Sequence, residues 1–264
     1  MKVLLSLAIF SSLMISMTAK PLIVAHRGAS FDAPENTLPA FELAWKQGAD
    51  AIEGDFRLTA DGHIVCVHDK DTDKYTTTNL VVAESTLEAL RKLDVGAYRG
   101  SEFIDTIIPT LKEVLQTVPE NKKIYIEVKS GKEIVPTLVA EIESSGLKTE
   151  QIVVIAFDSE VIRALKAMAP HYKACWLSGF ELDSNQELQP SPQSVLRTLK
   201  DISADGFSSS NKLIHEAYIR TILDSGYEYH VWTVDDPVEA QQFRSWGALS
   251  ITTNKPGFIR EHLK

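Results

Sequence analysis

The chain has 264 residues, of which 44% are hydrophobic and 24% are charged, and its formal net charge is −9. This is the composition of an ordinary globular protein that is long enough to bury one large core. An acidic chain without a run of lysine or arginine is a poor binder of nucleic acid or of an anionic membrane, so the composition argues against both partners.

Residues 1–19 have the layout of a secretory signal peptide. One lysine, Lys2, precedes an uncharged and mostly apolar run that ends near Ile15, and small residues follow up to Ala19. We expect cleavage after Ala19 or after Thr18, and a secreted or periplasmic protein with no stable membrane insertion after removal of the signal. An uncleaved anchor is the alternative, although the run is short for a membrane span.

Strand-like and helix-like segments alternate along the rest of the chain. Helices are expected after Thr37 as an N-cap, after Ser159 as the cap of Val161–Met168, and from Asp236-Pro237 onwards. Eight segments have the length and apolar content of buried strands: Leu22–Ala25, Ala51–Phe56, Ile124–Lys129, Ile152–Phe157, Ala174–Leu177, Gly206–Ser209, Tyr229–Val234 and Leu249–Thr252. Eight βα units in one domain, residues 20–264, predict an α/β fold of the (β/α)8 TIM-barrel type, with a doubly wound open sheet as the alternative.

A short antiparallel hairpin arm, Ile64–His68, is expected after the second strand. Only about seven residues separate it from Phe56, fewer than a parallel crossover needs, and residues 59–62 carry turn chemistry. A turn centred near Asp61 places Asp55 opposite Val67 and Glu53 opposite Asp69, so His68 is expected level with the Glu53/Asp55 pair.

Residues 70–108 form a longer connection than an ordinary barrel loop and contain one short helical candidate, Thr86–Leu93. We expect this segment to form a small cap over the barrel mouth that restricts which molecules enter.

The only two cysteines, Cys66 and Cys175, lie in apolar runs more than 100 residues apart. They are interpreted as buried side chains, with a disulfide as the alternative.

Ionisable side chains gather at the carboxyl ends of the predicted strands, where TIM-barrel enzymes hold their active sites. They are His26 and Arg27 on the first strand, Glu53 and Asp55 on the second, His68 on the arm, and Glu127 and Lys129 on the third; Trp232 lies towards the end of the seventh. Glu53 and Asp55 lie two residues apart and therefore share one face of their strand. The pattern predicts an active site rather than a packed core.

These stretches also carry a resemblance to a known family. The chain resembles the glycerophosphodiester phosphodiesterases from Pro21 to Lys264, through His26-Arg27-Gly28, Pro34-Glu35-Asn36-Thr37, Gly48-Ala49-Asp50, Ile52-Glu53 with Asp55, Thr59 with Asp61-Gly62, His68-Asp69, Tyr125-Ile126-Glu127-Val128-Lys129, Trp232-Thr233-Val234 and Ile251-Thr252-Thr253-Asn254-Lys255-Pro256. Ala156-Phe157 stands where the family often has Ser-Phe. The resemblance implies hydrolysis of glycerophosphodiesters, a small-molecule substrate, to glycerol 3-phosphate and an alcohol through a cyclic phosphate.

Glu53, Asp55 and Glu127 are the candidate metal ligands. Three carboxylates supply hard oxygen donors, which suit one divalent cation, Ca²⁺ or Mg²⁺, rather than zinc. From the residues alone, a solvated carboxylate pair or ion pairing with Arg27 and Lys129 remains an alternative. The resemblance favours the metal.

His26 and His68 are the candidate catalytic residues, because an imidazole titrates near neutral pH and suits general acid–base work. Which histidine is the acid and which is the base does not follow from the sequence. Arg27 and Lys129 are candidate phosphate partners, with neutralisation of nearby carboxylates as a role that either could share. The remaining histidines show no such constellation and are interpreted as structural or exposed: His63, His171, His215 and His230.

Three further residues are assigned to substrate binding. Glu35 is expected to orient Arg27 or to contact a substrate hydroxyl. Phe157 and Trp232 are expected to wall the glycerol pocket, with packing in the core as the alternative.

Two other functions stay open at this stage. A phospholipase D-like enzyme acting on sphingomyelin or lysophospholipids would need an apolar entrance, whereas Asp71–Asn79 is charged and rich in threonine. A non-catalytic barrel that only binds phosphoesters would be expected to lack a histidine or a metal carboxylate, and none is missing here.

Overall fold

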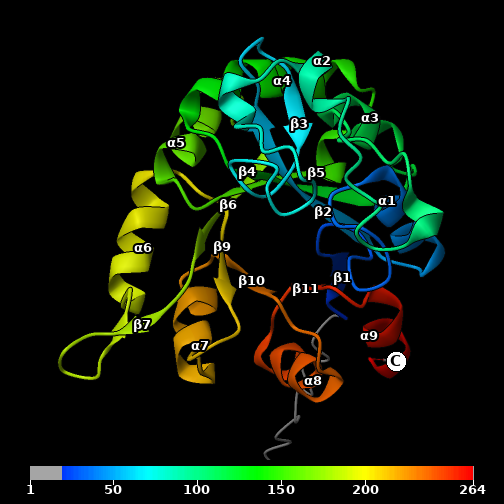
Figure 1. Cartoon of the computed structure of the whole chain (residues 1–264). Helices are drawn as coiled ribbons and strands as arrows, with labels where there is room; N and C mark the ends of the chain where they lie inside the picture. The colour runs from blue at the N-terminus through cyan, green and yellow to red at the C-terminus, as the bar shows by residue number, and fades with distance from the viewer. Residues whose placement is uncertain (1–19, 264) are drawn as a thin grey trace, which may run out of the picture.

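A computed structural model describes residues 20–263 and shows eight parallel strands arranged as a closed barrel (Figure 1). The barrel closes because β1 pairs in parallel with both β2 and β11, so the structure is a TIM barrel and the open-sheet alternative is wrong. The barrel strands are β1 (Leu22–Ala25), β2 (Ala51–Leu58), β4 (Lys123–Val128), β5 (Ile152–Ala156), β6 (Lys173–Ser178), β9 (Gly206–Ser210), β10 (Glu228–Trp232) and β11 (Ser250–Thr253). Each lies within two residues of its predicted bounds.

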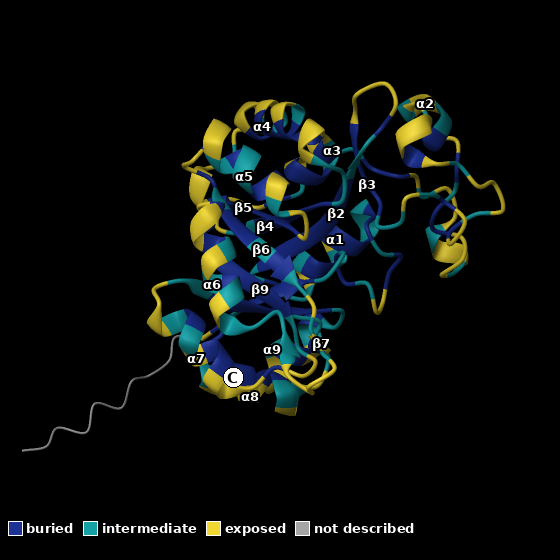
Figure 2. Ribbon diagram, turned by 90° about the vertical axis from the view of Figure 1, so that its left-hand side faces the viewer, coloured by how far each residue is buried: buried dark blue, intermediate teal, exposed yellow. Residues whose placement is uncertain are grey.

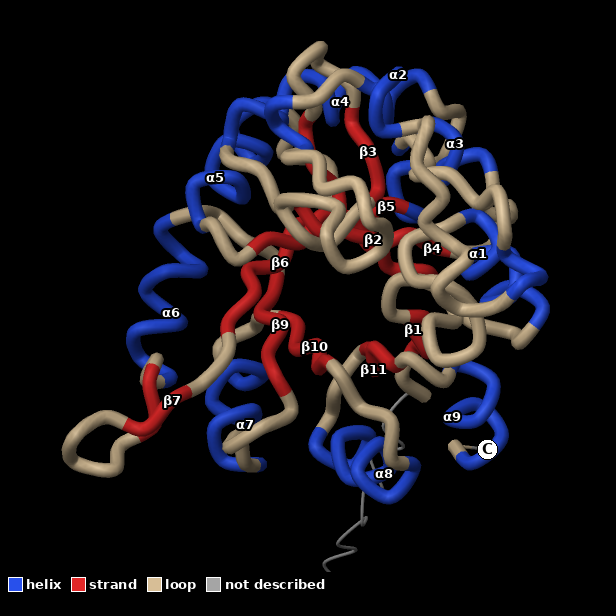
Figure 3. The backbone as a smooth tube through the Cα atoms, in the orientation of Figure 1, coloured by secondary structure: helices blue, strands red, loops and turns tan. Residues whose placement is uncertain are grey.

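Helices surround the strands on the outside of the barrel (Figure 3). They are α1 (Leu38–Lys46), α3 (Leu111–Gln116), α4 (Val135–Ser144), α5 (Ser159–Met168), α6 (Pro192–Asp201), α7 (Glu216–Asp224), α8 (Pro237–Trp246) and α9 (Pro256–His262). Thr37 is an N-cap, as predicted, and α8 opens at Asp236-Pro237, as predicted, with Asp236 as its N-cap. The predicted cap at Ser159 is wrong: the Asp158 carboxylate accepts from Glu160 N–H, and the helix begins at Ser159, two residues before the predicted Val161.

The antiparallel arm is β3 (Ile64–Cys66), which pairs with the end of β2. The predicted register is confirmed, since Val67 N–H donates to the Asp55 carbonyl at 2.8 Å. The arm is two residues shorter than predicted. His68 leaves the ladder, and its carbonyl accepts from Arg57 Nε and Nη2 at 2.9 and 2.7 Å.

Residues 70–108 pack against the arm and project from one side of the barrel (Figure 2). They contain α2 (Leu87–Leu90), capped by Thr86, and two 3₁₀ turns, η1 (Val82–Glu84) and η2 (Ser101–Phe103), so the predicted helix is shorter than expected. A separate apolar cluster joins this segment to the arm: Val65, Val67, Tyr75, Val82, Leu90, Leu93, Val95 and Ile108.

A small exposed hairpin, β7 (Glu181–Leu182) and β8 (Leu188–Gln189), follows β6 and was not predicted. Asp183 stabilises its turn by accepting from the backbone N–H groups of Asn185 and Glu187.

Both cysteines are buried and free, so the disulfide alternative is wrong. Among the described residues, no helix has both the length and the apolar character needed to span a membrane.

Candidate active site

Two candidate residues, His26 and Arg27, lie in a tight turn that directly follows β1. Arg27 and Gly28 both have left-handed backbone conformations, with φ of 55° and 81°. A Cβ on Gly28 would lie 2.6 Å from the carbonyl carbon of Ala40, so the close approach of α1 requires glycine here. Two hydrogen bonds hold the start of the turn: His26 N–H donates to the Thr253 carbonyl, and Arg27 N–H donates to Glu53 Oε2.

The three candidate metal carboxylates meet at the carboxyl end of β2 and β4. Asp55 and Glu127 are register partners on these adjacent strands, and Glu53 lies two residues before Asp55. One oxygen from each carboxylate lies within 4.8 Å of the other two, and all three side chains are buried. The predicted convergence on one face is therefore observed.

Two basic side chains lie against these carboxylates. Arg27 Nε is 3.1 Å from Asp55 Oδ2, and Lys129 Nζ is 3.2 Å from Asp55 Oδ1. Lys129 also forms an ion pair with Glu127. The ion pairing considered from the sequence is therefore present, and two of these three ion pairs involve Asp55.

The site still carries an excess of negative charge. Burial opposes ionisation of Asp55, but the charges of Lys129 and Arg27 outweigh it and lower the pKa of Asp55. Burial, followed by the charge of Asp55, raises the pKa of Glu53 well above its usual value and that of Glu127 to about 7. Glu53 Oε1 is buried without a hydrogen-bond partner. A buried carboxylate oxygen in this condition is a suitable ligand for a hard cation.

Both candidate histidines present one ring nitrogen to the same cavity. His26 Nδ1 lies 2.7 Å from Asn254 Oδ1, and His68 Nδ1 lies 2.8 Å from Asp69 Oδ1. Because amide and carboxylate oxygens only accept, each Nδ1 donates and each Nε2 is left free. Burial and the neighbouring Arg27 charge lower the pKa of His26 to about 4, and burial also lowers that of His68.

The cavity has a volume of about 110 Å³, and eight of the ten predicted site residues line it: His26, Arg27, Glu53, His68, Glu127, Lys129, Phe157 and Trp232. Phe157 is 46% exposed, so the core alternative is wrong for this ring. Its ring packs edge-on against Trp232 at 5.5 Å, and Lys129 Nζ lies 5.5 Å from its centre. Asp55 is fully buried behind the cavity.

Glu35 lies outside the cavity wall. Its Oε1 accepts from Arg27 Nη1 at 3.1 Å, from Lys74 Nζ at 2.7 Å and from the Tyr75 hydroxyl at 2.8 Å. Glu35 therefore orients Arg27, and it ties the segment 70–108 to the turn after β1.

The sequence did not single out four residues that position the site. Asn36 donates from Nδ2 to Asp55 Oδ2 at 2.8 Å, and Arg57 holds the His68 carbonyl. Asp235 accepts from both the backbone N–H and Nδ2 of Asn254, which turns Asn254 Oδ1 towards His26. Asn36 could have been found from the Pro-Glu-Asn-Thr motif, and Arg57 from its place two residues after Asp55. No local signal links Asp235 or Asn254 to the first strand.

Together these features define a TIM-barrel hydrolase whose mouth combines acid–base and anion-pairing groups. The model of the glycerophosphoryl diester phosphodiesterase family matches residues 26–258. The chain belongs to this family and is a phosphoric diester hydrolase.

Individual proteins that are similar to this chain carry the name of the same family. A glycerophosphodiester phosphodiesterase of Caldanaerobacter subterraneus is 40% identical over 159 residues, which span 58% of this chain and 65% of that protein. One of Bacillus subtilis is 28% identical over 258 residues, covering 91% of this chain and 85% of that protein. The structure of an Oleispira antarctica phosphodiesterase in complex with the product sn-glycerol-3-phosphate superposes with a TM-score of 0.82 at 23% identity, covering 92% of this chain and 96% of that one. At that identity the similarity shows the fold alone.

Proposed function

We propose that this protein hydrolyses glycerophosphodiesters to glycerol 3-phosphate and an alcohol, with one divalent cation and two histidines. The proposal rests above all on the convergence of Glu53, Asp55 and Glu127 beside the imidazoles of His26 and His68 at one cavity. Glycerophosphodiester phosphodiesterase relatives supply the substrate class.

Glu53, Asp55 and Glu127 would hold the cation, since all their donors are oxygen and one buried oxygen has no partner. When bound, a divalent cation neutralises charge that develops on a non-bridging phosphate oxygen. Ca²⁺ and Mg²⁺ both suit this donor set.

Arg27 and Lys129 would bind the phosphate. Both line the cavity, and their positive charges are shared with buried carboxylates rather than with solvent. The planar guanidinium of Arg27, held by Glu35, can contact two phosphoryl oxygens. Phe157 and Trp232 would form the apolar wall against which the glycerol carbons pack.

The two histidines would divide the proton transfers. His26 is neutral and offers a free Nε2, which suits removal of the proton from the glycerol 2-hydroxyl as it attacks the phosphorus. His68 would act in its protonated form: the Asp69 carboxylate beside Nδ1 stabilises the imidazolium, whose Nε2–H can protonate the leaving alkoxide. The attack forms a cyclic phosphate and expels the alcohol, and water then opens the ring with the two proton transfers reversed.

The protein would act outside the cytosol. This proposal rests on the signal-peptide layout of residues 1–19, which lie outside the described residues. The segment 70–108 would act as a cap that restricts the alcohol part of the substrate, because Lys74 and Tyr75 reach the site through Glu35.

The experiment that tests the proposal compares glycerophosphocholine with its analogue that lacks the glycerol 2-hydroxyl. Positioning of an internal nucleophile accounts for several kcal/mol of barrier lowering, so we expect the turnover rate to fall by about 10³-fold or more. The analogue should still bind as a competitive inhibitor, since the phosphate contacts remain. Equal turnover rates would mean that water attacks the phosphate directly.

A further inference from the structure

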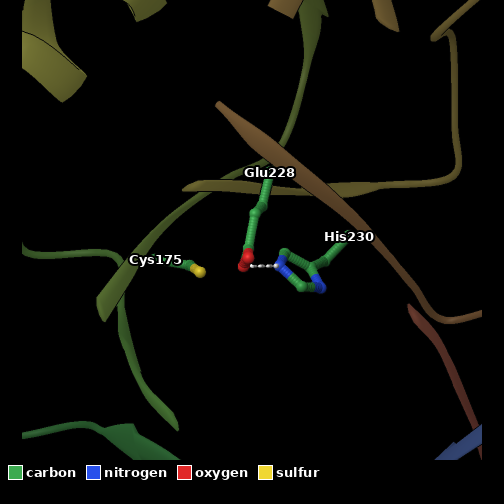
Figure 4. Close-up of side chains that lie close together, drawn as sticks. All are labelled: Cys175, Glu228 and His230. Atoms are coloured by element: carbon green, nitrogen blue, oxygen red, sulfur yellow. Dashed lines mark ion pairs between the residues drawn. The ribbon is translucent and has the colours of Figure 1, made fainter. Parts of the chain in front are cut away.

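A second cluster of metal-ligating side chains lies at the opposite end of the barrel. Cys175 on β6 and Glu228 and His230 on β10 each offer one donor atom, and the three atoms lie within 4.8 Å of one another (Figure 4). A cavity of about 480 Å³ opens beside them, lined by Glu228 and His230 and by the first residues of several strands. The proposed catalytic mechanism uses none of these three residues.

The missing side chain of Gly206 creates the space in which the cluster forms. Gly206 on β9 pairs with Cys175 on one side and with Glu228 on the other. A Cβ at this position would lie 2.9 Å from Glu228 Cβ and 3.1 Å from Cys175 Sγ. Two strands that are not neighbours therefore bring their side chains together across a glycine.

The imidazole of His230 points Nε2 into the cluster, towards Glu228 (Figure 4). His230 is 4% exposed, and its Nε2 has no hydrogen-bond partner. Its other nitrogen, Nδ1, lies 2.8 Å from the Ser250 hydroxyl, which can accept the Nδ1 proton and leave the lone pair on Nε2. In that tautomer the Nε2 lone pair faces Glu228 Oε2 at 3.5 Å with no proton between them, and a metal ion would satisfy both atoms.

The carboxylate of Glu228 is held in a similar way. Its Oε1 pairs with the Lys173 ammonium, while Oε2 lies 3.5 Å from His230 Nε2. Metal ligands in proteins commonly have their outer atoms fixed by such neighbours, which orient the donor atoms.

We propose that Cys175, Glu228 and His230 form a second metal site, selective for a borderline cation of the Zn²⁺ type, with a fourth position open to the cavity. A mixed set of sulfur, nitrogen and oxygen donors is typical of tetrahedral zinc sites. Tetrahedral bonds of about 2.0–2.3 Å place ligand atoms about 3.3–3.7 Å apart. His230 Nε2 and Glu228 Oε2 are already 3.5 Å apart, and the approach still needed between any two of the three donor atoms is at most about 1.5 Å. The thiol releases its proton to solvent as the cation binds.

The barrel would then have two metal sites that select different kinds of cation. The carboxylate site at the catalytic mouth has only hard oxygen donors, whereas the second site, formed by Cys175, Glu228 and His230, contains a thiol and an imidazole. Zinc at the second site would join β6 to β10 across β9 and so stabilise the end of the barrel remote from the catalytic site.

The test uses the purified protein, stripped of metal and then given excess Mg²⁺ to fill the carboxylate site. Co²⁺ is titrated as a spectroscopic stand-in for Zn²⁺, and the near-ultraviolet thiolate-to-cobalt charge-transfer band is recorded. The chain has two cysteines, so Cys66→Ser is the matched control for Cys175→Ser. Cys66 is also buried and lies close to the carboxylate site, where its Sγ donates to Asn36.

We expect a one-equivalent band in the wild type and in Cys66→Ser, and no band in Cys175→Ser. His230→Gln should weaken Co²⁺ binding by about tenfold or more. Zn²⁺ should raise the unfolding temperature of the wild type and Cys66→Ser but not that of Cys175→Ser. Absence of the band in the wild type, or a band that survives in Cys175→Ser, would overturn the proposal whether or not a variant folds poorly.

Discussion

Replacement of Glu127 by glutamine should change how stability depends on pH in the metal-free protein. In the folded chain, burial and the charge of Asp55 raise the pKa of Glu127 to about 7, against 4.5 for an unperturbed glutamate. Between these two values the unfolded chain has released the Glu127 proton while the folded chain still holds it. The folded state then binds more protons, so the free energy of unfolding falls as pH rises through this window.

The size of this effect follows from the shift in pKa. A difference of about 2.5 pH units at about 1.36 kcal/mol per unit gives a loss of about 3 kcal/mol, complete once the pH passes the folded value. Glutamine keeps the volume and polarity of the side chain but does not titrate. The fall in stability assigned to Glu127 should therefore be absent from Glu127→Gln.

Urea unfolding in the presence of a chelator, at about pH 5 and about pH 8, measures this difference. We expect the wild type to lose about 2.5 kcal/mol more than Glu127→Gln across the range, since a small part of the loss has already occurred at pH 5. Saturating Ca²⁺ or Mg²⁺ should remove most of the difference, because a bound cation compensates the ionised carboxylate. An identical pH dependence in the two proteins would refute the account of charge in this site.

Two further predictions concern the histidines. His26→Ala and His68→Ala should each lower the turnover rate by about 10²–10⁴-fold with an unchanged circular dichroism spectrum, and a variant that keeps more than about a tenth of wild-type turnover would show that its histidine is not an acid–base group. Asp235→Asn should release the amide of Asn254 and lower kcat by up to about 10²-fold with little change in KM. In that variant, nitrogen NMR of the imidazole should show His26 leaving the Nδ1–H tautomer, and an unchanged ring spectrum would contradict the positioning role.

The strands and the hairpin arm could be predicted because their signals are local. Apolar runs, turn residues and the short distance from Phe56 to Ile64 fix an antiparallel register, and the structure has that register. The clustering of Glu53, Asp55 and Glu127 followed from the rule that parallel strands of a barrel present their carboxyl ends at one mouth.

The support around these residues could not be predicted, because it depends on contacts between distant parts of the chain. Asn254 meets His26 across 228 positions, and its orientation depends on Asp235 in another loop. The approach of Cys175 to His230 likewise requires the order of β6, β9 and β10 in the barrel. From the sequence, His230 was only one of several histidines interpreted as structural or exposed, and the structure shows it buried.

Hydrolysis should require a cation held by Glu53, Asp55 and Glu127. The most direct measurement is the release of glycerol 3-phosphate from glycerophosphocholine by metal-stripped protein, before and after addition of Ca²⁺ or Mg²⁺. We expect no significant release before addition and restored release afterwards, with no restoration in a variant that lacks one of the three carboxylates. Undiminished release by the metal-stripped wild type would contradict it.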